Sequence, residues 1–154
     1  MAIEIERAFV ASDVPDATLL GPGVPLRQGY VAREADAEVR VRISADVATL
    51  TIKVGRGLVR TEVDVPIPLE TAEALWPHTA GRRIDKTRHR VGLGGLVAEV
   101  DVYAGELAGL CRIEVEFPSE SEAAAFVPLP WFGREVTGDT RWSNSSLARN
   151  GRPD

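Results

Sequence analysis

Apolar and polar residues alternate along most of the chain, beginning with the stretch IEIERAFV at Ile3–Val10. Alternation with a period of two is typical of β-strands, because successive side chains of a strand point to opposite faces. Short turn segments such as Gly21-Pro22-Gly23 separate several of these stretches and favour antiparallel hairpins. The pattern predicts eight strands, at Ile3–Val10, Leu26–Ala32, Ala37–Ile43, Val47–Val54, Leu58–Ile67, Arg82–Val91, Leu96–Tyr103 and Cys111–Phe117.

Helical segments are fewer. We expect helices at Leu69–Trp76, after Pro68, at Ser119–Phe126, where Ser119 and Glu122 have the spacing of a capping box, and at Asn144–Arg149. Many strands joined by hairpins are typical of a barrel, which also removes exposed strand edges. The predicted fold class is mainly β (α+β): an eight-stranded antiparallel closed β-barrel with a few flanking helices. We expect one domain over residues 1–154, with a frayed tail at about 150–154.

Composition narrows the class of protein. The 154 residues are 44% hydrophobic and 27% charged, which is typical of a soluble globular domain. No apolar run approaches the roughly 20 residues that a membrane helix needs, and no secretory signal is visible. These features and the lone Cys111 favour a cytoplasmic location without a membrane partner. The net charge of −5 argues against binding to a nucleic-acid polymer.

The charged residues are sorted by sign along the strands. Glu4 and Glu6 share one strand face, whereas Arg40 and Arg42 share another. Two interpretations remain open: a charged exterior around an apolar centre, which is the ordinary arrangement, or a polar lumen inside a wide barrel. In a polar lumen, carboxylates would suit a divalent cation and cations would suit a polyanion. The carboxylates are Glu4, Glu6, Glu114 and Glu116, and the cations are Arg40, Arg42, Lys53, Arg60, Lys86 and Arg88.

IEIERAFV resembles the opening E-x-E-x-K strand of the CYTH superfamily, the triphosphate tunnel metalloenzymes. The similarity is strongest to small bacterial members that act on inorganic tripolyphosphate. It continues in order through most of the chain, at PLRQGY (Pro25–Tyr30), EVRVR (Glu38–Arg42), TIK (Thr51–Lys53), GRRIDKTR (Gly81–Arg88), EVDVYAGEL (Glu99–Leu107), IEVEF (Ile113–Phe117) and PWFGREVTGD (Pro130–Asp139).

The resemblance implies a barrel with a charged tunnel that binds a triphosphate with Mg²⁺ or Mn²⁺. It implies catalytic roles for Glu4 and Glu6. The implied metal ligands are Glu4, Glu6, Glu62, Asp64, Glu114 and Glu116. The implied substrate-binding residues are Arg40, Arg42, Lys53, Arg60, Lys86, Arg88 and Arg141, the last of these in a segment that closes part of the tunnel.

Ala8 departs from the motif, which has a lysine at this position that contacts substrate. The resemblance implies metal-dependent hydrolysis of a triphosphate, foremost inorganic tripolyphosphate to pyrophosphate and phosphate, weakened by Ala8. Two alternatives stay open: an adenylate cyclase of class IV type, and a module that binds a triphosphate without turnover. The expected partner is tripolyphosphate or another triphosphate, and a homodimer is an open alternative.

Overall fold

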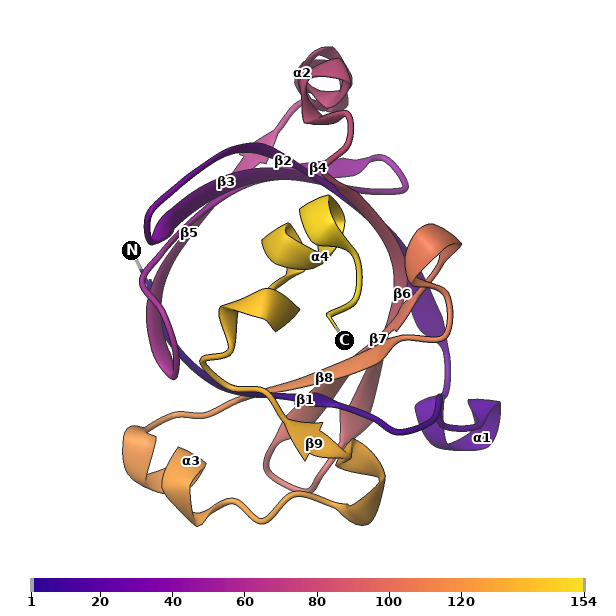
Figure 1. Cartoon of the computed structure of the whole chain (residues 1–154), viewed down its shortest axis with the longest axis vertical. Helices are drawn as coiled ribbons and strands as arrows, with labels where there is room; N and C mark the ends of the chain where they lie inside the picture. Colours follow the sequence, from indigo (N-terminus) through magenta and orange to yellow (C-terminus); the bar gives the residue numbers. More distant parts are fainter. Residues whose placement is uncertain (1, 154) are drawn as a thin grey trace.

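The computed structural model describes residues 2–153 and contains a closed antiparallel barrel. Eight strands follow the order β5-β4-β3-β2-β6-β7-β8-β1, and β5 pairs with β1 to close the ring (Figure 1). This confirms the predicted architecture. The strands are β1 (Ala2–Val10), β2 (Gly23–Glu34), β3 (Ala37–Ser44), β4 (Val47–Val54), β5 (Val59–Ile67), β6 (Arg83–Gly92), β7 (Val97–Tyr103) and β8 (Cys111–Glu116).

Strand β1 closes the barrel by changing partners along its length. Its first half, through Ile5, pairs with β5, and its second half, from Glu6, pairs with β8. A two-residue strand that the sequence pattern did not predict, β9 (Arg134–Glu135), adds to the end of β1. The even-numbered residues of β1 therefore all point into the barrel. There they lie next to inward-facing side chains of β5 and β8.

The three predicted helices are present, a short first helix was not predicted, and the helices lie in two different places. Helices α1 (Ala17–Leu20), α2 (Leu69–Leu75) and α3 (Glu120–Ala125) lie outside the ring of strands in Figure 1, whereas α4 (Asn144–Asn150) lies within it in this view. Single 3₁₀ turns are η1 (Trp76–Thr79), η2 (Gly105–Leu107), η3 (Pro130–Phe132) and η4 (Thr140–Trp142). Residue 150 ends α4 instead of fraying, and Asp154 lies outside the described residues. Within residues 2–153, no helix is both long and apolar enough to cross a membrane.

Two apolar clusters explain how the barrel is covered. Outside it, Phe9, Ile113 and Val115 pack against Ala123 of α3 and against Phe132, whose ring lies 5.0 Å from that of Phe9. At one end of the barrel, inward-facing Ala8, Val10, Ile84 and Tyr103 pack against the C-terminal segment, which contributes Val136, Trp142 and Leu147. The C-terminal segment thus covers the end of the barrel at which Ala8 lies.

Gly133 ties the C-terminal segment to β1 and allows a sharp stability prediction. Its φ is +73°, and an added Cβ would collide with the carbonyl oxygen of Val10. We expect Gly133→Ala to lower the free energy of unfolding by about 2–4 kcal/mol, because left-handed strain and a backbone clash add together. Gly109→Ala is the matched control, since Gly109 has a φ of +93° but open space around its Cβ position. Urea denaturation showing equal losses for the two variants would contradict the close contact.

Candidate active site

The charged faces of the strands point into the barrel. Lys86 is 3% exposed, Arg40 5%, Lys53 7%, Glu114 8% and Glu6 9%. The apolar residues between them on the same strands face outward, where α2 and α3 cover part of them. The polar lumen, rather than an apolar centre, is therefore the arrangement that the structure has.

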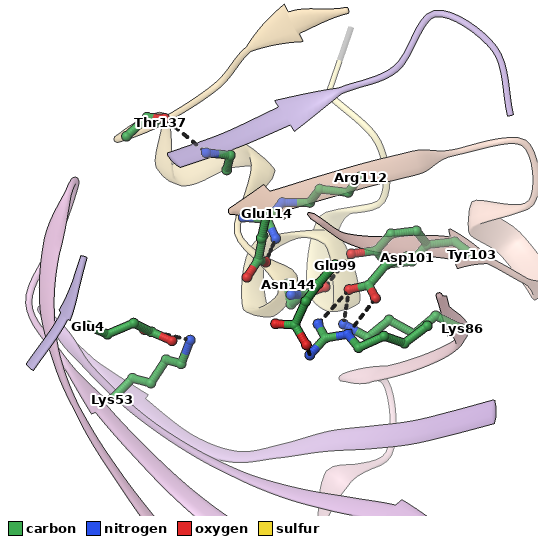
Figure 2. A network of polar contacts seen from close by, with 12 residues as sticks. Glu4, Lys53, Lys86, Glu99, Asp101, Tyr103, Arg112, Glu114, Thr137 and Asn144 are labelled. Carbon is green, nitrogen blue, oxygen red and sulfur yellow. Dashed lines mark hydrogen bonds and ion pairs between the residues drawn. The ribbon is translucent and has the colours of Figure 1, made fainter. Parts of the chain in front are cut away.

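A cavity of about 570 Å³ occupies the larger part of the lumen. Its lining combines both signs of charge: carboxylates come from β1, β5, β7 and β8, and cations come from β3, β4 and β6. Figure 2 shows Glu4 with Lys53 on one side of this space and Glu99 with Asp101 on the other. The expected site residues that line it are Glu4, Arg40, Arg42, Lys53, Glu62, Asp64, Arg88, Glu114 and Glu116. Three residues that were not expected there, Arg90, Glu99 and Asn144, line it as well. Glu116, which is exposed, lies at the solvent side of this set.

A second cavity, of about 80 Å³, lies farther toward the covered end. Its polar lining includes Glu6, Glu38, Arg60 and Arg112, and Ala8 forms part of its wall. Each of Glu6, Arg60 and Arg112 is two residues from a residue of the larger cavity on the same strand face: Glu4, Glu62 and Glu114 respectively. Residues two apart on a strand face lie next to each other along the strand, so the two cavities lie one after the other along the barrel.

Arg40, Arg42 and Arg88 form a cationic wall of the larger cavity, in which the charges of Arg40 and Arg88 act on Arg42. Burial lowers the pKa of Arg42, and the neighbouring charges of Arg40 and Arg88 lower it further, to about 10. The Arg42 guanidinium donates to Oε1 of Gln28 from Nε (3.3 Å) and Nη2 (3.2 Å), and Nε2 of Gln28 donates to the Tyr30 hydroxyl at 3.0 Å. Gln28 and Tyr30 are both fully buried. Gln28 and Tyr30 on β2 therefore hold the Arg42 guanidinium close to two other cations. A bound anion would make this arrangement more favourable.

Lys86 differs from the other cations because a carboxylate already neutralises it. Its ammonium donates to Oδ2 of Asp101 at 2.6 Å, and Arg88 donates to both oxygens of the same carboxylate at 2.8 and 2.9 Å. Burial raises the pKa of Asp101, but the charges of Lys86 and Arg88 and their hydrogen bonds bring it well below its usual range. Lys86 lines neither of these two cavities, and its ammonium is bonded to Asp101, which also accepts from Arg88.

Glu4 and Glu6 of β1 and Glu62 of β5 form an acidic wall, in which the carboxyl groups of Glu4 and Glu62 adjoin. The ammonium of Lys53 lies 3.2 Å from Oε2 of Glu4 and 3.4 Å from Oε2 of Glu62. Burial raises the pKa of Glu4, an effect that Lys53 opposes and Glu62 reinforces, so the net shift is upward. Burial also raises the pKa of Glu62, but its hydrogen bond with Glu4 and the charge of Lys53 lower it to about 2. Burial likewise raises the pKa of Glu6.

These groups fit a hard divalent cation only in part. Carboxylate oxygens are suitable ligands, and the buried Oε2 of Glu4 has the ion pair with Lys53 but no further hydrogen-bond partner. In the part of the chain that the structure describes, however, no three acidic, histidine or cysteine side chains converge as a ready metal site. Mg²⁺ is commonly held by one or two carboxylates, with substrate phosphates and water completing its shell. The donor set suits a cation of that kind better than a fully protein-bound ion.

One expected site residue lies apart, and several interior residues were not expected. The side chain of Arg141 is 65% exposed and donates to both carboxylate oxygens of Asp139, at 3.0 and 2.7 Å, so the structure does not bring it together with the other cations. Arg112 was not expected in the lumen, although it precedes Glu114 by two residues and thus shares its face. Asp101 and Gln28 were also not assigned roles, because only cross-strand register shows which cations they contact.

Comparisons with known proteins agree with this geometry. The family model for the CYTH domain matches residues 3–139. An inorganic triphosphatase of Nitrosomonas europaea is 46% identical over 147 residues, which cover 94% of this chain and 96% of that protein. Another, of Acetivibrio thermocellus, is 39% identical over 153 residues, with 97% and 96% coverage. A crystal structure of an inorganic triphosphatase superposes with a TM-score of 0.71 at 41% identity and covers 99% of both chains.

Proposed function

The chain belongs to the CYTH domain family and is a homologue of bacterial inorganic triphosphatases, and from this premise we propose that it hydrolyses inorganic tripolyphosphate to pyrophosphate and phosphate. The observation that carries the proposal is the buried cationic wall of the larger cavity. The charges of Arg40 and Arg88 lower the pKa of Arg42, and the Arg42 guanidinium donates to the neutral amide of Gln28 instead of a carboxylate. A polyanion would relieve this repulsion.

The proposed roles follow from the two walls. Arg40, Arg42 and Lys53 would neutralise the phosphate chain, and the guanidinium groups of the two arginines match phosphate oxygens bidentately. Phosphoryl transfer depends mainly on positioning and charge stabilisation, so the site requires no covalent nucleophile. Glu4, Glu6, Glu62, Asp64, Glu114 and Glu116 are the residues that would hold Mg²⁺ or Mn²⁺. When bound, such an ion neutralises phosphate charge and lowers the pKa of an attacking water.

The direct test is phosphate release. We expect the purified chain to release orthophosphate from tripolyphosphate with Mg²⁺ or Mn²⁺ and to release none with excess EDTA, since no divalent cation then neutralises phosphate charge or lowers the pKa of the attacking water. ATP and pyrophosphate serve as competing substrates in the same assay. Faster turnover of ATP than of tripolyphosphate would contradict the proposed substrate.

A second candidate function is triphosphate binding without turnover, and Ala8 favours it. Loss of one preorganised electrostatic contact typically lowers the rate by about 10²–10³. Calorimetric binding of tripolyphosphate together with no phosphate release above the uncatalysed rate would select this alternative. Formation of cyclic AMP from ATP would instead indicate a cyclase.

A further inference from the structure

The smaller cavity contains cations with unused hydrogen-bond donors. Arg112 comes from β8, and its side chain is 9% exposed. Its Nη1 donates to Oε1 of Glu114, whereas its buried Nε has no partner. Arg60 comes from β5 on the other side of β1, lies 3.6 Å from a carboxylate oxygen of Glu38, and also has a buried Nε without a partner. Buried guanidinium N–H groups without partners are costly, and an anion in this cavity would satisfy them.

The register of β1 and β8 makes Arg112 a diagonal neighbour of Ala8 on the inward face. Ala8 lies opposite Glu114, and Val10 lies opposite Arg112. Figure 2 shows the Arg112 side chain beside Glu114. Because Glu114 pairs with Ala8 across the strands, the Arg112 guanidinium extends along β8 toward the position across from Ala8. The methyl group of Ala8 leaves this space free, whereas a long side chain at that position would enter it. The cation therefore approaches the same part of the lumen from the neighbouring strand.

The size and connection of the cavity suit one phosphate group. A single water needs about 10–15 Å³ of such space, so a cavity of about 80 Å³ has room for a phosphoryl group. It follows the larger cavity along the barrel, and Arg112 contacts Glu114, which lines the larger one. A chain that occupies the larger cavity can thus extend its end phosphate toward Arg112 and Arg60.

We propose that the cavity beside Ala8 is a subsite for the end phosphate of the triphosphate and that Arg112, with Arg60, binds it. This inference rests on the proposed function, because it assigns one phosphate of the same substrate. Arg112 supplies charge and hydrogen-bond donors to the phosphate oxygens. The subsite makes the barrel selective for a chain of three phosphates over a chain of two.

The test compares tripolyphosphate with pyrophosphate. We expect Arg112→Leu to weaken tripolyphosphate binding by about 10- to 100-fold, as measured by titration calorimetry in EDTA, because charged hydrogen bonds are lost. Pyrophosphate affinity should stay within about twofold, since the larger cavity and its cations suffice for two phosphates. Arg27→Leu, on the outer face of β2, is the control and should change neither affinity.

Rescue from position 8 separates a ligand contact from a structural role. Ala8→Lys should restore tripolyphosphate affinity about tenfold in Arg112→Leu and change it less than about threefold in the wild type, because the subsite then already holds a cation. Arg112→Lys, which keeps a cation beside Glu114, should fold and show the same selective loss at a smaller size.

Equal weakening of tripolyphosphate and pyrophosphate by Arg112→Leu, or no weakening of either, would overturn the subsite while leaving the proposed function intact. If the wild type bound no tripolyphosphate with or without Mg²⁺, the proposed function itself would fail.

Discussion

Asp101→Asn is expected to lower the free energy of unfolding by about 3–5 kcal/mol, the range measured when one partner of a buried ion pair is removed. Asp101 is 1% exposed and the Lys86 side chain is fully buried, so water cannot replace the lost charge. Burial lowers the pKa of Lys86, and Asp101 is the main group that opposes this shift. In the variant, Lys86 and Arg88 would face each other without the carboxylate between them.

Urea denaturation at neutral pH measures this loss, and Asp85→Asn is its control. Asp85 lies on the outer face of β6, where its side chain is 65% exposed and 3.8 Å from Arg27, so its removal should change stability by less than about 0.5 kcal/mol. A loss below about 1 kcal/mol for Asp101→Asn would show that the buried carboxylate is not needed to hold the two cations.

The free energies of unfolding of the wild type and Asp101→Asn should also depend differently on pH. The pKa of Asp101 is lowered in the folded state, so its contribution is complete above the unfolded value of 3.8 and is lost as the pH falls. The gap between wild type and Asp101→Asn should therefore be constant from about pH 8 to pH 5 and should narrow below about pH 4. A gap that widened on acidification would contradict an ionised Asp101.

The strands were predictable because one physical rule governs them. Alternation sorts Glu4, Glu6, Arg40 and Arg42 to one side of their strands, and closing the sheet makes that side the inside. The same rule applies to Arg112, which precedes Glu114 by two residues and therefore shares its inward face. Elements of a few residues, such as α1 and β9, are too short to show a period.

Cross-strand register was what the sequence did not supply. Alternation places Lys86 on the inner face, but only the pairing of β6 with β7 sets Arg88 opposite Asp101 and brings Lys86 to the same carboxylate. Lys86 was expected to bind phosphate, which stays a prediction, and register adds that its ammonium is paired with the buried Asp101. Arg141 lies in the 3₁₀ turn η4, which is too short to show a period, so its exposure could not be inferred.

The second large effect is expected on binding. Arg42→Gln should weaken tripolyphosphate binding by at least about 100-fold, because it removes a guanidinium that can donate two charged hydrogen bonds to phosphate oxygens. It should not destabilise the fold. Glutamine keeps an N–H donor for Oε1 of Gln28, and its neutrality relieves the repulsion from Arg40 and Arg88 that lowers the pKa of Arg42. We expect stability equal to the wild type or about 1 kcal/mol greater.

Thermal unfolding with and without tripolyphosphate measures both effects on the same sample. The wild type should gain about 2.7 kcal/mol of stability at a ligand concentration of 100 times its dissociation constant, and Arg42→Gln should gain almost none at that concentration. Arg27→Gln, the same change on the outer face, should behave as the wild type. A variant less stable than the wild type that still binds tripolyphosphate normally would show that Arg42 supports the barrel instead of the ligand, and the cationic wall would then have to be explained as structure.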